Sequence, residues 1–248
     1  LVRDPRLAQA YVRAMTESGK EVLLPDFLAA VDAVAAKSGS PGPLVGALRG
    51  WLEATPTTPA RAEAVAEQAD GLARGRWPDA VDVLRLVADA RYKAAEVTPP
   101  EWEPVRTERA VQAYDRVRAK LPDDKEAATA LGWLSLFVQK NPNQAATLAA
   151  PLLTPEAEAG LSYRQAELVG AIHRATGRVD DAVRVLERVC GTPADAELAA
   201  QPTSPLPAAP AGCHVQLARA YLARRDHAAA YARLRVAQRM PRTPHEQA

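Results

Sequence analysis

At 248 residues the chain is long enough to bury a substantial core, as one large domain or two small ones. Its 31 basic and 30 acidic side chains leave a formal charge of +1, which excludes a global field that draws the protein to nucleic acid or to an anionic membrane. The hydrophobic fraction of 48% includes only 5% aromatic residues and is rich in alanine, a composition that favours closely packed helices over a sheet.

The 21 prolines divide the chain into segments, because a proline inside a helix removes a hydrogen bond and clashes with the preceding turn. Between them the apolar residues recur with helical spacing, and no stretch alternates with period two for long enough to predict a strand. We predict about twelve helices in six hairpins, at about 4–18, 25–38, 43–54, 59–74, 78–95, 101–120, 124–140, 143–153, 158–176, 178–191, 212–224 and 226–240. Helix start signals occur at "TPPE" (98–101) and "TPEAE" (154–158), where a threonine cap precedes a proline and a glutamate.

The stretch "ATGRVDDAVRVLERV" (175–189) carries an apolar stripe that includes Ala182, Val183 and Leu186, with charged residues on the opposite side. Upstream, "AELVGAIHRATG" ends at Gly177, which can adopt the positive φ that terminates a helix. These two helices are therefore expected to form an antiparallel hairpin.

The same spacing returns near the end of the chain. Gly170 precedes Ala182 by twelve residues, and Ala218 precedes Ala230 by twelve, each hairpin closing on a proline. Both hairpins resemble the tetratricopeptide repeat, a unit of about 34 residues with a small residue deep in each helix. The resemblance covers about 105–241, where "ERAVQAYDRVRAKLPDD" and "ALGWLSLF" continue the pattern, and it is weak before that.

The resemblance implies an all-α fold, a right-handed α-solenoid of stacked antiparallel hairpins with a concave wall made by first helices. It implies a degenerate hairpin region at 1–104, continuous with tetratricopeptide-like repeats at 105–248. The Pro/Ala-rich segment 191–212 departs from the family as an insertion between two repeats, expected to be a surface loop.

Eight residues are expected on the concave wall when the repeat is applied to the sequence. They are Thr129, Trp133, Phe137, Arg164, Glu167, Arg174, Gln216 and Arg219. An aromatic pair flanked by arginines could hold a peptide, because Trp and Arg are favoured at binding hot spots. The alternative is that Trp133 and Phe137 pack against an adjoining hairpin. The Asn and Lys residues by which some tetratricopeptide domains hold a C-terminal carboxylate are not found at the corresponding positions.

Cys190 and Cys213 lie at the two ends of the 191–212 segment, where helix ends of a solenoid come close. They form a disulfide if the protein is exported, closing a loop of about 20 residues, or they are two independent buried thiols. A zinc site that uses them with His214 lacks a clear fourth ligand. His173 replaces a bulky residue of a first helix and is read as packing rather than catalytic.

No phosphate-binding, dinucleotide-binding, metalloprotease or nucleophile-elbow motif occurs, so the sequence predicts no enzymatic activity and no cofactor. The leading hypothesis is a scaffold or adaptor that binds a protein or peptide, including another segment of its own parent chain. The alternative is a structural α-solenoid arm of a membrane-coat or envelope assembly. The basic segment 231–242 is explained by a solvated last helix, so no nucleic-acid partner is predicted.

No apolar run approaches the roughly 20 residues that span a bilayer, so no direct transmembrane segment is predicted. The sequence begins at Leu1 without a Met or a signal-type apolar region. We therefore expect a piece of a longer polypeptide, and the compartment stays open.

Overall fold

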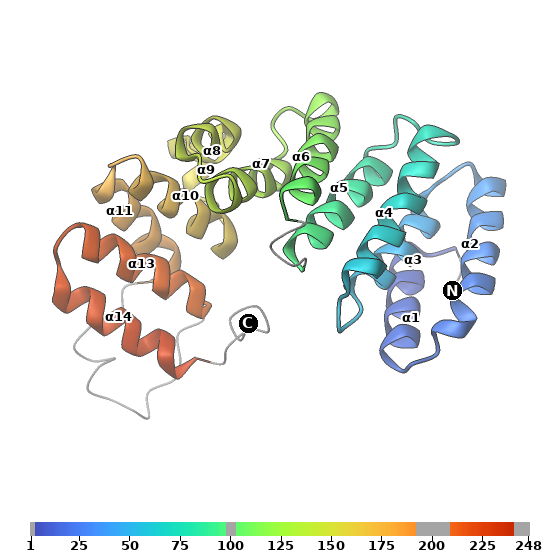
Figure 1. Ribbon diagram of the computed structural model, residues 1–248, viewed down its shortest axis with the longest axis horizontal. Coiled ribbons are helices and arrows are strands. Elements are labelled where there is room, and N and C mark those ends of the chain that lie inside the picture. Colours follow the sequence, from blue (N-terminus) through green and yellow to red (C-terminus); the bar gives the residue numbers. More distant parts are fainter. Residues whose placement is uncertain (1–2, 98–102, 192–208, 241–248) are drawn as a thin grey trace. The chain divides into compact units, whose positions relative to one another are not determined.

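A computed structural model of the protein describes residues 3–97, 103–191 and 209–240 (Figure 1), and these residues form helices and no strand. The prediction of an all-α fold is confirmed for this part of the chain. The chain divides into two compact units, Leu1–Ala127 and Ala128–Ala248. The predicted cap at 98–101 and most of the 191–212 insertion lie outside the described residues. The solenoid stays a prediction.

Unit 1 contains the helices up to the first residues of α7. They are α1 (Pro5–Glu17), the 3-10 turn η1 (Glu21–Leu23), α2 (Leu24–Ser38), α3 (Gly42–Glu53), α4 (Pro59–Arg74), α5 (Val81–Glu96) and α6 (Glu103–Lys120). From α3 onward each helix packs against the next one along the chain, and α3 also packs against α5.

The first hairpin of unit 1 differs from the prediction, because α1 packs mainly against α3 and makes little contact with α2. Glycines on α3 explain the preference: a Cβ on Gly46 would lie 2.2 Å from the backbone oxygen of Pro5, and one on Gly50 would lie 2.2 Å from that of Gln9. These two glycines, one helical turn apart, let the backbones of α1 and α3 touch.

Unit 2 begins within α7 (Lys125–Trp133), which continues into a π-helical turn at η2 (Leu134–Val138). The remaining elements are α8 (Pro142–Leu148), the 3-10 turn η3 (Ala150–Leu152), α9 (Pro155–Glu158), α10 (Tyr163–Ala175), α11 (Val179–Cys190), α13 (Ala211–Ala223) and α14 (His227–Arg239). Figure 1 shows α10, α11, α13 and α14 in succession, and α10 packs on α11 and α13, α11 on α13, and α13 on α14.

Local chemistry sets most helix starts. Thr154 caps α9 by accepting a hydrogen bond from the backbone N–H of Ala157, as its start signal predicts. The predicted helix 158–176 is wrong at its start, because α9 ends at Glu158 and α10 begins anew with a capping box between Ser162 and Gln165.

The α10–α11 hairpin has the close approach that its spacing predicts. Gly177 takes a φ of 80° at the turn. A Cβ on Gly170 would lie 2.5 Å from a methyl carbon of the fully buried Leu186, so only glycine leaves room for that side chain. This contact fixes the orientation of α10 relative to α11. It therefore also determines which side chains α10 presents on its opposite side.

Candidate functional site

The candidate site lies on one face of α10 and α13 in unit 2. Two contacts place these helices in register: the Glu167 carboxylate lies against Gly212, and Arg174 interacts with Arg219. Because both contacts advance from the N-terminus toward the C-terminus on each helix, α10 and α13 run in the same direction.

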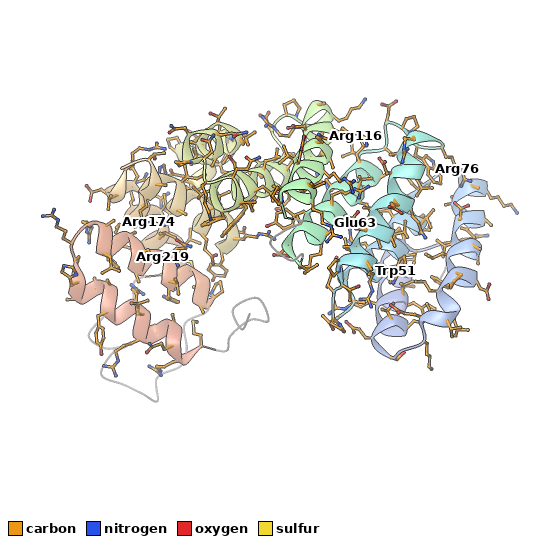
Figure 2. All side chains as sticks on the ribbon, in the orientation of Figure 1. Trp51, Glu63, Arg76, Arg116, Arg174 and Arg219 are labelled. Carbon is orange, nitrogen blue, oxygen red and sulfur yellow. A yellow bond between two sulfur atoms is a disulfide. The ribbon has the colours of Figure 1, made fainter. Side chains whose placement is uncertain are left out.

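Arg174 and Arg219, here called the arginine pair, lie on these two neighbouring helices (Figure 2). Arg219 is exposed and Arg174 is half-buried, with its Nε atom buried and without a hydrogen-bond partner. Burial, together with the positive charge of Arg219, lowers the pKa of Arg174 from its ordinary value. Neither guanidinium has an ion-pair partner among the described residues, so the two like charges face each other uncompensated.

Glu167 occupies the opposite end of the same face. A Cβ on Gly212 would lie 2.9 Å from Oε1 and 3.0 Å from Oε2 of Glu167, so the glycine makes space for the carboxylate at the first turn of α13. A negative charge is favourable there because the first N–H groups of a helix carry partial positive charge. Glu167 therefore complements the start of α13, and Arg164, one turn earlier on α10, is exposed.

Trp133 and Phe137, here called the aromatic pair, stack with ring centroids 4.2 Å apart and an interplanar angle of 28°. They stand on the helical stretch where α7 widens into the π-helical turn, a feature that is frequent at functional sites. Both rings pack against the core of unit 2 and remain half-exposed, and the indole Nε1 has no hydrogen-bond partner. Packing against the core, the alternative drawn from the sequence, is thus part of their role.

Two of the eight predicted wall residues need correction. Thr129 is 3% exposed and Gln216 is 8% exposed, so neither presents its side chain on an open surface. Gln216 lies on α13, which packs on α10, α11 and α14, and the repeat spacing alone did not reveal that this side chain is covered. The other six predicted wall residues are exposed or half-exposed. The structure stacks Trp133 on Phe137 and places Arg174 and Arg219 on neighbouring helices.

His173 is buried, as its packing interpretation expects, and it has a partner that sequence reasoning missed. Its Nε2 lies 3.3 Å from Oε1 of the buried Glu158, whose other oxygen accepts a hydrogen bond of 2.7 Å from Arg184. Burial lowers the pKa of His173, while Glu158 opposes that shift. The three side chains join α9, α10 and α11, which is a structural role.

His214 is also fully buried, and neither ring nitrogen has a hydrogen-bond partner. Burial, reinforced by the buried positive charge of Arg233, lowers the pKa of His214 to about 4. The imidazole is therefore neutral in the native protein near neutral pH.

The two cysteines are joined as a disulfide in the structure, with their Cα atoms 5.9 Å apart. The bond connects the last residue of α11 to the first turn of α13. Within the described ranges no three His, Cys, Asp or Glu side chains converge as they would around a metal ion.

Unit 1 has a groove of about 570 Å³ between α2, α3 and α4. Leu28, Leu44, Leu48 and Leu72 line it, and Arg76 donates a hydrogen bond of 2.8 Å to Asp32 at its rim. Helical periodicity places these leucines on apolar stripes, but it gives no sign that the stripes leave a gap.

Comparison with known proteins gives no match to a family model and none to a curated protein. None of the helices in the described part of the chain pairs enough length with enough hydrophobicity for a bilayer crossing. The tetratricopeptide resemblance therefore depends on residue spacing alone and stays a prediction.

Proposed function

We propose that the protein is a non-enzymatic interaction module, a tetratricopeptide-like solenoid that binds a peptide or protein on the face formed by α10 and α13. The observation that carries the proposal is the arginine pair, two positive charges on neighbouring helices without an ion-pair partner among the described residues. Repulsion between these two positive charges is unfavourable in the free protein, and a bound partner of opposite charge would relieve it.

The aromatic pair supports the same function. Stacked rings that are half-exposed offer apolar area, while the indole Nε1 of Trp133 is itself buried. Trp is enriched at interfaces because its ring is a large apolar group. The partner is thus expected to bring apolar groups to this pair.

The test is capture of a partner by the full chain, compared among variants. Trp133→Ala and Arg219→Glu are expected to weaken capture while leaving the helical content unchanged by circular dichroism. Arg188→Glu is the matched control for the change of charge, since Arg188 is exposed and lies on α11. Capture by both test variants at the wild-type level would reject this face as the binding surface.

A second candidate is a structural arm of a larger assembly, and exposed apolar residues of unit 1 favour it. Val22 is 83% exposed, and Leu7, Tyr11 and Leu23 nearby on α1 and η1 are each at least 42% exposed. Exposed apolar groups can contribute to contact surfaces between proteins. Multi-angle light scattering distinguishes the two functions, because a protein that stays monomeric at high concentration contradicts self-assembly, and Val22→Asp would abolish self-assembly if it occurs.

A further inference from the structure

The groove of unit 1 has α2 on one side, α4 on the other and α3 at its floor. Leu44 and Leu48 of α3 form the floor and are 5% and 0% exposed, while Leu28 of α2 and Leu72 of α4 form the walls. Its volume of about 570 Å³ falls within the range of about 300–1,000 Å³ that small-molecule sites occupy in proteins. The groove therefore has the size and the apolar lining of a site for a small molecule.

Gly71 on α4 keeps one wall of the groove open. It is one of the lining residues, and a Cβ at this position would meet no atom within 4 Å. A helix position normally favours a larger residue, because glycine in a helix is less stable than alanine. The absence of a side chain here leaves space beside the leucines that a larger residue would fill.

The charged residues that line the groove are one acid and one base, Asp32 and Arg76, and they bind each other. Nη1 of Arg76 donates a hydrogen bond of 2.8 Å to Oδ1 of Asp32, and the guanidinium also lies 4.9 Å from the ring centroid of Trp77 (Figure 2). Because Asp32 belongs to α2 and Arg76 follows α4, the ion pair bridges the two walls. The rim is therefore polar at this point and carries no net charge.

This charge balance determines which head group suits the rim. A carboxylate would face the like charge of Asp32, and an ammonium would face that of Arg76. A hydroxyl both donates and accepts a hydrogen bond, so it can bind the Asp32 carboxylate and the Arg76 guanidinium at the same time. A helix of a partner protein that lay between the two walls would have to displace the ion pair, which favours a small molecule over a protein segment.

We propose that this groove is a binding site for an uncharged amphiphile, a small molecule with an apolar body and a hydroxyl head. The apolar body lies on the leucines and removes their apolar surface from water. The hydroxyl lies at Asp32 and Arg76. The site belongs to unit 1, whereas the proposed function concerns α10 and α13 of unit 2, so this proposal goes beyond that function and does not depend on it.

Two fluorescent probes with the same ring system test the charge requirement. N-phenyl-1-naphthylamine is uncharged, and 8-anilino-1-naphthalenesulfonate is the same molecule with a sulfonate. Titration of the full chain is expected to show saturable binding of the uncharged probe and binding of the sulfonate that is at least about tenfold weaker. Decanol is expected to displace the uncharged probe, and ionised decanoate at the same concentration is expected to displace it less.

Variants connect that binding to the groove. Gly71→Leu fills the space beside the leucines and is expected to weaken binding of the uncharged probe about tenfold or more. Ala60→Leu is the matched control and is expected to bind as wild type, because Ala60 is exposed on the same helix and does not line the groove. Asp32→Asn leaves the charge of Arg76 uncompensated at the rim, so it is expected to strengthen binding of the sulfonate several-fold while the uncharged probe binds as before. Circular dichroism checks that each variant is folded.

Four results would overturn the proposal: no saturable binding of the uncharged probe, equal binding of the two probes to the wild-type chain, equal effects of Gly71→Leu and Ala60→Leu, or an unchanged preference between the probes in Asp32→Asn. Light scattering tests another occupant. A dimer that Gly71→Leu converts to a monomer would show that a second copy of the chain fills the groove, and that result also rejects the small molecule. Partner capture by Trp133→Ala tests the proposed function alone.

Discussion

The closeness of α10 and α11 can be tested by adding one carbon atom at Gly170. An alanine Cβ there would lie 2.5 Å and 2.6 Å from two side-chain carbons of Leu186, where about 3.5–4.0 Å is the optimum separation. Leu186 is fully buried, so its side chain cannot turn toward solvent. Overpacking costs about 1–3 kcal/mol, against a gain of about 1 kcal/mol from replacing glycine in a helix.

Gly170→Ala is therefore expected to lower the free energy of unfolding by up to about 2 kcal/mol. The same Gly→Ala change at two other positions provides a comparison for this loss of stability. Gly71→Ala adds a Cβ with nothing within 4 Å and is expected to be neutral or to stabilise. Gly50→Ala meets the backbone oxygen of Gln9 at 2.2 Å, which no rotamer change can relieve, and is expected to cost the most.

Urea denaturation of the three glycine variants ranks their free energies of unfolding. Hydrogen exchange with mass spectrometry shows which of the two units each variant destabilises. Leu186→Ala, combined with Gly170→Ala, removes the atoms that clash, so the two changes are expected to couple by about 1 kcal/mol or more. Three glycine variants of equal stability, or strict additivity with Leu186→Ala, would refute the close approach of α10 and α11.

Three further predictions concern unit 2. Arg219→Gln is expected to stabilise the free protein by up to about 1 kcal/mol, because it removes a like-charge contact with Arg174; a lower melting temperature by calorimetry would contradict this. Thiol titration of denatured, unreduced protein is expected to find no free thiol, and Cys213→Ser is expected to lose about 3 kcal/mol of stability because the bond closes a loop between positions 23 residues apart; two free thiols would show that the bond does not form. His214 charges near pH 6.5 in the unfolded chain but only near pH 4 in the native protein, so stability is full above pH 6.5 and is expected to fall by up to about 3 kcal/mol as the pH drops to 4. His214→Gln is expected to remove that slope from urea denaturation midpoints measured across this range, and an unchanged slope would assign it to other groups.

Helix positions could be predicted from the sequence because their causes are local. Proline fixes the backbone at the starts of α1, α4, α8 and α9, and Asp, Thr or Asn side chains cap them. The break before α10 was missed because its cap, Ser162, lies inside what periodicity reads as one helix.

The π-helical turn at 134–138 could not be predicted from the local sequence either. The apolar residues of this stretch fit an α-helix as well as a π-helix. Positive φ at Lys140 and the cap at Asn141 then end the stretch earlier than predicted. Such turns depend on how the next elements pack, which a single sequence does not display.

The candidate site could be predicted only in part, since its residues fall on the expected helices but differ in exposure. Arg174 and Arg219 lie on neighbouring helices because α10 packs on α13, and that packing is a tertiary feature. Burial of Thr129 and Gln216 depends on how closely neighbouring helices approach, and that distance is set by contacts far along the chain. The pairing of Glu158 with His173 is likewise tertiary, because α9 is too short to show a periodic pattern.

The bond between Cys190 and Cys213 has a consequence for a cut chain. A protease that cleaves once anywhere between these two positions leaves the N-terminal and C-terminal pieces covalently attached to each other. The nicked protein would migrate as one band on a gel without reductant and as two bands after reduction. Hydrolysis in this region would thus leave α11 and α13 tethered, and the helices that carry Arg174 and Arg219 would stay in one molecule.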